Sequence, residues 1–340
     1  MGRSPSDLAV FVAKRIAQLV PVLFGAVTIT FIFARLSISN PCVAWEGSKA
    51  TKTSLQACTH YFGLNLPLYV QYGRYWQGLL SGNWGIDPNT GLAVLPSLLQ
   101  AFPETLELVL AALLLMVVIG IPLGVIAANS NGRWADHLVR VFYLSGWSTP
   151  TYLAAALLAI GVGSSVGLGS GAFSTFPPPF SEPTHVSVLD AALSGNPLNI
   201  GDALGHLILP AIALAFLNMG IVTRLTRSAM LESLPMDFVK TARMKGLSEF
   251  WVLYKHALRQ SLISTTTVLG LTAGYLLGAT VVVEEIFQWP GIGQYAFTAV
   301  QTYNFPGTIG VVIFLAVAVV VANLVADILY GVLDPRVEWR

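Results

Sequence analysis

The chain has 340 residues, of which 54% are hydrophobic and only 10% are charged, and its net charge is +1. Soluble domains carry roughly 25% charged residues, so this composition argues against a disordered chain and against an ordinary soluble enzyme. The near-zero net charge indicates no nucleic-acid partner, and two cysteines are too few for a zinc-finger or iron–sulfur framework. We therefore expect an all-α polytopic membrane protein.

Long apolar stretches predict the membrane-spanning helices. A spanning helix needs about 20 mostly apolar residues. The chain offers six such helices, within residues 16–34, 107–133, about 141–167, 202–224, 259–284 and 306–330. We divide the chain into an N-terminal tail with the first helix (1–35), an outer loop (36–106) and a five-helix core (107–340) that includes a long loop at 224–259.

The positions of lysine and arginine predict the orientation. Of the 18 such residues, 14 lie in four segments, which are 1–15, 128–140, 224–259 and the C-terminal tail. Basic segments stay on the cytosolic side, so both termini and the 224–259 loop are predicted to be cytosolic, in a multi-pass cell-membrane protein. Cys42 and Cys58 then lie in the outer loop, where they either pair, contributing about 3 kcal/mol, or remain two free thiols.

Several kinds of chemistry have no motif in the chain. It has no G-x-x-x-x-G-K-[ST] phosphate loop and no H-E-x-x-H or C-x-x-C pattern, so we expect no ATP site, no metal site, no cofactor and no enzymatic activity in this chain. Glu284, Glu285 and Asp327 lie near span ends, where we interpret them as interfacial caps or ion pairs. The scarcity of other charges within the spans argues against an ion-coupled transporter.

The 224–259 loop has the signals of a helix–turn–helix. Asp237 is a candidate N-cap for a helix that starts near Phe238, Gly246 would end that helix, and a second helix would begin after Ser248. An alternative interpretation is a basic amphipathic hairpin held by anionic lipid.

This loop resembles the coupling loop of ABC-importer permeases of the dipeptide/oligopeptide/nickel type. That branch reads basic-Thr-Ala-Arg-x-Lys-Gly-Leu, as residues 240–247 do here. The resemblance continues along nearly the whole chain, including an outer amphipathic segment at 66–85. It implies a coupling site on the ATPase made of Asp237, Phe238, Lys240, Thr241, Ala242, Arg243, Lys245 and Gly246.

The resemblance also implies the function and the partners. Such a permease subunit forms half of a translocation pathway, here predicted for peptides, with oligosaccharides or nickel as alternatives. It would pair with a second permease subunit in a heterodimer, with two ATPase subunits that hold ATP and Mg²⁺, and with an outer substrate-binding protein. A stand-alone secondary transporter is the alternative from another class.

The pathway itself leaves a weaker pattern. Gly270, Gly274 and Gly278 follow one another at four-residue spacing in the fifth predicted span. Such stripes commonly pack against neighbouring helices, and we favour that interpretation over a mobile seam between two permease subunits. Asn218, in the fourth predicted span, is a further candidate for the same region.

Overall fold

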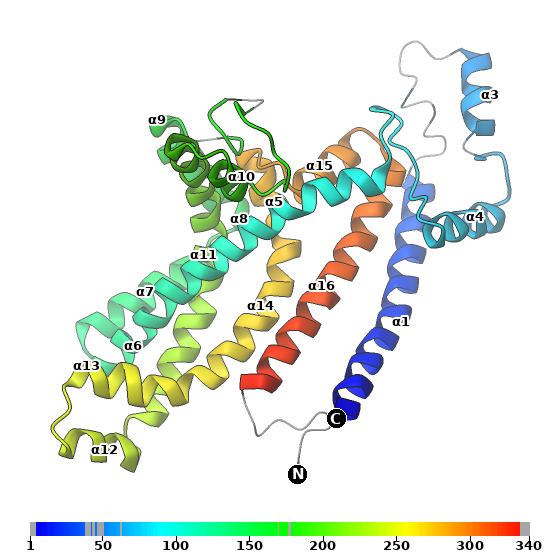
Figure 1. The fold of residues 1–340 in the computed structure, drawn as a ribbon. Helices are drawn as coiled ribbons and strands as arrows, with labels where there is room; N and C mark the ends of the chain where they lie inside the picture. Colours follow the sequence, from blue (N-terminus) through cyan, green and yellow to red (C-terminus); the bar gives the residue numbers. More distant parts are fainter. Residues whose placement is uncertain are drawn as a thin grey trace.

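The computed structural model describes residues 5–37, 42, 45, 51–61, 63–168, 170–175 and 178–333. These residues form helices joined by loops, together with one isolated β-bridge between Ile86 and Ala93. The long helices lie side by side, and shorter helices gather at their two ends (Figure 1). The predicted all-helical architecture is thus confirmed.

Four helical segments are long and apolar enough to cross a membrane. The first is continuous from Val94 to Asn129 and comprises α5 (Val94–Leu115), the π-helical turn η2 (Met116–Gly120) and α6 (Ile121–Asn129). The others are α11 (Pro197–Ser233), α14 (Leu258–Phe287) and α16 (Phe305–Leu333). The segment Val94–Asn129 begins inside the predicted outer loop 36–106.

A fifth span exists if a bent pair counts as one crossing. α7 (Trp134–Ser148) and the segment Thr151–Val166 meet at an angle of 105°. That segment comprises α8 (Thr151–Leu158), the π-helical η3 (Ala159–Gly163) and α9 (Ser164–Val166). The prediction of one unbroken helix over 141–167 is therefore wrong. The cause is Pro150, since proline disfavours the helical conformation of the residue before it, and Thr149 is extended with ψ 126°.

The remaining predicted span corresponds to α1 (Pro5–Ser37), whose apolar portion in the described residues is Val20–Phe33. α1 packs along α16, where Val27 contacts a small core cluster with Ile309 and Ile313. By length and composition, the described residues thus hold four spans, or five with the bent pair, and the predicted sixth is the shorter apolar helix.

α11 lies at the centre of the helix packing and contacts α5, α6, α7 and α14. Small residues on its neighbours permit this close approach. A Cβ atom on Gly124 of α6 would lie 2.6 Å from Cβ of Thr226, and one on Gly146 of α7 would lie 2.6 Å from the Phe216 carbonyl oxygen. Packing of this kind brings helix backbones together where lipid offers no hydrophobic drive.

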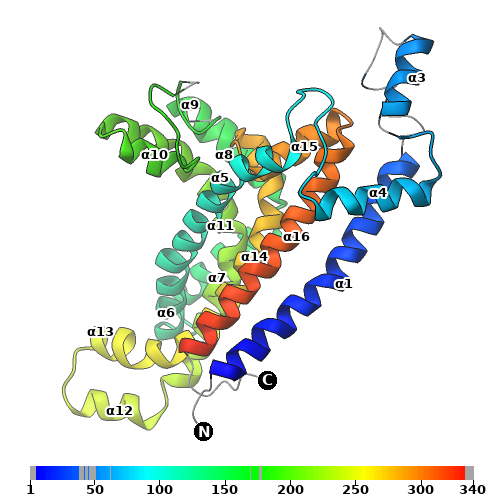
Figure 2. The ribbon, with the colours of Figure 1, turned by 45° about the vertical axis from the view of Figure 1, so that its right-hand side comes forward.

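The short helices divide between the two ends of the long helices. α3 (Lys52–Tyr61), α4 (Leu68–Leu80), α10 (Ser187–Leu193) and α15 (Ile292–Gln301) lie at one end. α12 (Asp237–Met244) and α13 (Glu249–Trp251) lie at the other (Figure 2). The first described turn of α1 and the last of α16 lie toward the end with α12 and α13. A disulfide joins Cys42 and Cys58, whose Cα atoms are 6.0 Å apart.

Candidate functional site

The predicted helix–turn–helix is present as a hairpin made of α12, a turn at 245–248 and α13. α12 starts one residue earlier than expected. Met236 is the residue at the N-cap position, with φ −70° and ψ 151°, so the prediction of Asp237 as the N-cap is wrong. Asp237 is instead the first helical residue, where a carboxylate interacts favourably with the helix dipole, and its Oδ1 lies 3.0 Å from Lys240 Nζ.

Gly246 ends α12, as predicted. Its φ is +74°, in the left-handed region that glycine adopts without steric cost. The Gly246 N–H donates to the Arg243 carbonyl at 2.9 Å, and the Leu247 N–H donates to the Ala242 carbonyl at 3.4 Å. These bonds satisfy carbonyls at the end of α12 and turn the chain toward Ser248, after which α13 begins.

An ion pair closes the hairpin across its turn. Arg243 donates from its NH2 and Nε atoms to the two carboxylate oxygens of Glu249, at 2.7 and 3.2 Å. These hydrogen bonds from Arg243 lower the pKa of the Glu249 carboxyl below its ordinary value. α13 continues without interruption through the π-helical η4 (Val252–Ala257) into α14. The hairpin is therefore continuous with a long helix of the membrane-spanning set.

The two faces of α12 differ in character. Val239 and Ala242 are 0% and 4% exposed, because α12 packs on η4 of its own chain. The predicted outward contact of Ala242 is thus not what the structure shows. Phe238 and Met244 are 41% and 79% exposed, and Lys240, Thr241, Arg243 and Lys245 are exposed beside them. The exposed residues of α12 therefore include an apolar side chain in its first turn and another in its last turn, with basic residues between and after them.

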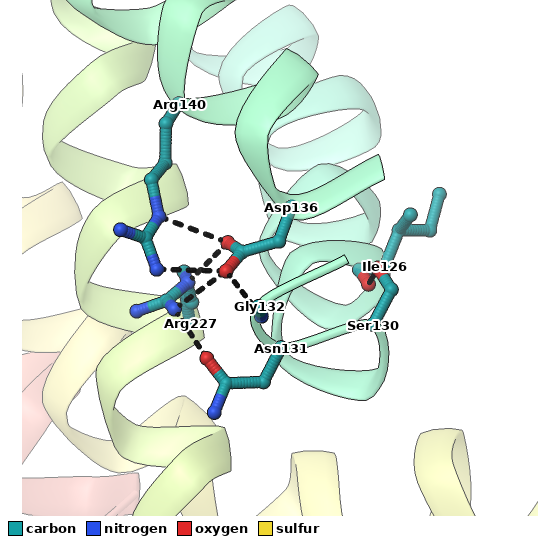
Figure 3. Close-up of polar contacts among 7 residues, drawn as sticks. All are labelled: Ile126, Ser130, Asn131, Gly132, Asp136, Arg140 and Arg227. Carbon is teal, nitrogen blue, oxygen red and sulfur yellow. Dashed lines mark hydrogen bonds and ion pairs between the residues drawn. The ribbon is translucent and has the colours of Figure 1, made fainter. Parts of the chain in front are cut away.

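A buried carboxylate anchors the helix that leads into this hairpin. Asp136, at the start of α7, is 0% exposed and binds the guanidinium groups of both Arg140 and Arg227 (Figure 3). Its Oδ2 also accepts from the Gly132 N–H at 3.0 Å. Arg227 reaches it from α11 and donates further to Asn131 Oδ1 at 2.8 Å. We call these five residues the Asp136 clamp.

The clamp has a defined place in the chain. α11 ends at Ser233, directly before the hairpin. The clamp ties this end of α11 to the turn between α6 and α7, while a Ser233–Ser261 hydroxyl contact of 3.1 Å ties it to α14. Sequence reasoning placed Arg140 and Arg227 only as cytosolic charges. The i, i+4 spacing of Asp136 and Arg140 could have predicted their ion pair. The contact between Asp136 and Arg227 spans 91 positions, and no local sequence pattern predicts it.

The glycine stripe of α14 serves two purposes. A Cβ atom on Gly270 would lie 2.6 Å from Cβ of Ala326, and one on Gly274 would lie 2.6 Å from Asn323 Oδ1, so both glycines let α16 approach. Gly278 has no such neighbour within 4 Å and is exposed. Gly270 also lines an apolar cavity of about 840 Å³ between α5, α14 and α16. Asn218 does not line that cavity, and its amide donates to the Leu214 carbonyl.

At the other end of the molecule, sequence reasoning missed a buried polar junction around Glu284. Glu284 is fully buried and accepts from the hydroxyl of Thr105 at 2.9 Å and from the Gly293 N–H at 2.7 Å. The Trp289 indole donates to the Glu104 carbonyl at 3.0 Å. Glu284 thereby caps the first turn of α15 and joins α5 to α14. Among the residues that the structure describes, no three His, Cys, Asp or Glu side chains form a metal-ion group.

Comparison with known families bears on the whole arrangement. Residues 120–339 match the family of binding-protein-dependent transport system inner membrane components. The chain belongs to this family. It is therefore a multi-pass inner-membrane permease, the transmembrane component of an ABC importer, and it lacks an ATPase domain.

Full-length relatives of the permease are transport proteins of the same kind. It is 42% identical over 329 residues to the probable D,D-dipeptide transport system permease protein of Escherichia coli K12, covering 95% of this chain and 96% of that one. It is 38% identical to a di/tripeptide transport system permease protein of Pseudomonas aeruginosa, over 97% of this chain and 99% of the relative. An oligopeptide transport system permease protein of Bacillus subtilis is 32% identical, over 98% and 100%.

A solved structure shares the fold of the permease. The MetNI methionine ABC transporter, in an inward-facing conformation, superimposes with a TM-score of 0.51 at 16% sequence identity, covering 71% of this chain and 97% of the matched chain. At this identity the likeness concerns the fold alone. The solved chain covers 71% of the permease, so the shared fold extends over most but not all of the permease.

Proposed function

We propose that this permease forms half of the translocation pathway for di- and oligopeptides in an ATP-driven importer. The observation that carries the proposal is the 42% identity, over 95% of the chain, to a protein named as a D,D-dipeptide permease. The di/tripeptide and oligopeptide permeases named above point to the same substrate class. Oligosaccharides and nickel remain the alternatives from the sequence, whereas the relatives named above are all peptide permeases.

The proposal includes the partners on the side of the hairpin. Two ATPase subunits, which bind ATP and Mg²⁺, would dock on the exposed face around Phe238 and Met244, with Lys240, Arg243 and Lys245 meeting acidic ATPase residues. Closure of the ATPases on nucleotide would then displace α12, and with it η4 and α14. A second permease, in a heterodimer, and an extracytoplasmic binding protein would complete the assembly. Gly278, which is open, is the stripe position proposed for the seam between permeases.

The proposed topology has six spans with both termini in the cytosol. It is supported by the basic residues of the hairpin segment and by the position of the described ends of α1 and α16 on the same side as the hairpin. α3, which carries Cys58 of the Cys42–Cys58 disulfide, lies toward the opposite end, as expected for the oxidising side. A membrane-impermeant thiol reagent should label Leu198→Cys but not Glu249→Cys in intact cells. Labelling of position 249 would contradict this topology.

Reconstitution tests the proposed function. Proteoliposomes that hold both permeases and both ATPases are supplied with the binding protein on one side of the membrane. They should take up a radiolabelled dipeptide only when Mg-ATP is present on the side that carries the ATPases. Proteoliposomes that hold this chain alone should show neither ATP hydrolysis nor uptake. Peptide flux through this chain alone, driven by an ion gradient, would favour the secondary transporter instead.

A further inference from the structure

A second, smaller pocket lies away from the hairpin and from the large apolar cavity. It has a volume of about 250 Å³ and lies between the last turns of α1, helix α4 and the start of α16. Two arginines, Arg35 and Arg74, line it together with Gln71, Tyr75 and Phe31. No aspartate or glutamate is among its lining residues in the described part of the chain. The charged side chains among the described lining residues are therefore both cationic.

The two arginines have no anionic partner among the described residues. The ion pairs of the described chain involve Arg140, Arg227 and Arg243 but neither Arg35 nor Arg74. Arg35 is partly buried, and its guanidinium lies 5.4 Å from the centre of the Phe31 ring. Removing a charged group from water without a partner is costly. Arg74 is exposed, so this cost falls on Arg35. A partly buried guanidinium and a second guanidinium lining the same pocket indicate an anionic ligand.

Further polar atoms in the pocket also lack a partner. The Tyr75 hydroxyl and the Gln71 Oε1 atom are buried without a hydrogen bond. The Gln71 Oε1 atom only accepts hydrogen bonds, so of these two atoms only the Tyr75 hydroxyl can bind an anion. Gln71 is fixed in orientation, because its Nε2 donates to the carbonyls of Leu64 and Leu66 at 3.2 and 2.7 Å. Buried polar groups are nearly always satisfied by protein or by another group. The Tyr75 hydroxyl can donate to an anion beside the two guanidinium groups.

The position of the pocket relates it to the membrane surface. Arg35 is the second residue after the apolar segment Val20–Phe33 of α1, at the depth where such a segment leaves the hydrocarbon. α4 runs across the end of α1 rather than along it (Figures 1 and 2). α4 has no fully buried residue and exposes Leu68, Tyr69 and Leu80. A short amphipathic helix of this kind lies in the plane of the headgroups.

We propose that this pocket binds a phosphate group, and that at the membrane surface the group is the headgroup of an anionic phospholipid. Arg35 and Arg74 would donate to the phosphate oxygens, as planar guanidinium groups do, and Tyr75 would add a third donor. The lipid would fasten α4 to α1 and α16 at the end that also carries the disulfide. The proposal does not depend on the transported substrate.

The test uses the complete transporter purified in mild detergent. We would count retained phospholipid by native mass spectrometry and measure the thermal stabilisation given by added phosphatidylglycerol. Arg35→Gln/Arg74→Gln should retain no tightly bound phospholipid and bind phosphatidylglycerol at least about tenfold more weakly, because it loses the charge-assisted hydrogen bonds to the phosphate. Tyr75→Phe should bind phosphatidylglycerol more tightly than the double variant does. Lys52→Gln, which removes an exposed charge of the same end, should bind like the unmodified protein.

Other results would overturn the proposal. Equal lipid retention and equal stabilisation in Arg35→Gln/Arg74→Gln and in Lys52→Gln would show that the pocket holds no headgroup. Stabilisation by inorganic phosphate alone, without an effect of phosphatidylglycerol, would replace the lipid with a free anion. Loss of the binding protein from the double variant at unchanged lipid content would assign the arginines to an acidic protein surface. Should the double variant not assemble, Tyr75→Phe and each single arginine variant give the same comparison.

Discussion

Arg227 of α11 holds Asp136 of α7 through two hydrogen bonds of 2.7 and 2.9 Å, although 91 positions separate the two residues. The Asp136 carboxylate is completely buried, and Arg140 and the Gly132 N–H complete its hydrogen bonding. The contact joins the turn between α6 and α7 to the end of α11 from which the hairpin departs. It therefore fixes where the hairpin begins relative to the rest of the helices.

Asp136→Asn should destabilise the permease by about 3–5 kcal/mol, because it leaves a buried guanidinium without its counter-charge. Arg227→Gln should act in the same range, since the Arg227 side chain is 14% exposed. Arg140→Gln should cost about 1 kcal/mol or less, because the Arg140 side chain is 38% exposed and solvent screens it. Thermal unfolding of the purified complex measures all three. Equal effects of the two arginine variants would contradict this account of the clamp.

Gly246→Val should weaken the co-purification of the ATPase or uncouple ATP hydrolysis from uptake, with the membrane abundance unchanged. An L-residue with a side chain pays roughly 1–2 kcal/mol in the left-handed conformation, and φ at Gly246 is +74°. Gly195→Val is the matched control, since Gly195 has φ +70° and equally open surroundings at the other end of the molecule. Gly246→Asn should be milder, because asparagine tolerates this conformation.

The outcome for Gly246 separates three cases. Normal uptake at normal abundance in Gly246→Val would reject the coupling role. Loss of the protein from the membrane would assign Gly246 to folding. An equal defect in Gly195→Val would show that backbone strain at a left-handed position causes the effect, whether or not that position lies in the hairpin.

Ala242→Asp should unfold the hairpin rather than merely repel a partner. Ala242 is buried against η4, so a carboxylate there would lose its hydration without gaining a hydrogen bond, at a cost of a few kcal/mol. Thr241→Asp places the same group on the neighbouring exposed position and should leave the hairpin folded. Limited proteolysis between residues 234 and 251 distinguishes the two. Equal protection of both variants would contradict the inward orientation of Ala242.

Cys58→Ser should loosen the segment that contains α3. The Cys42–Cys58 bond closes a loop of 16 residues, for which chain entropy predicts about 3 kcal/mol. Cys42→Ser and the double variant should show the same increase in protease sensitivity as Cys58→Ser, because each removes the same single bond. A double variant more sensitive than either single one would mean that the cysteines act separately.

The extent to which the sequence predicted this fold depends on the range of the interactions involved. The turn at Gly246 and the helix start after Ser248 follow from local backbone preferences, and both are found. The α7–α8 bend at Pro150 was also a local signal, but the uncharged run on both sides concealed it. The N-cap residue of α12 is Met236 rather than Asp237, a difference of one residue that is usual at helix ends.

The faces of the helices were harder to predict than the helices themselves. Ala242 was expected to face outward, and only the packing of α12 on η4 determines that it faces its own chain. Glu284 looked like an interfacial residue, whereas the chain returns over it through α15 and supplies its hydrogen bonds. The partners of Asp136 and Glu284 come from distant segments, and no local pattern in one sequence specifies them.

The most direct measurement for the central claim is a crosslink between the hairpin and the ATPase. A photo-crosslinking amino acid at Phe238, on the exposed face of α12, should yield a covalent product with an ATPase subunit in membranes that hold the whole transporter. The same amino acid at Leu198, exposed in the first turn of α11 and so at the opposite end of that helix from the hairpin, should yield none. Crosslinks to the ATPase from position 198, or their absence from position 238 in an assembled and active transporter, would contradict the account.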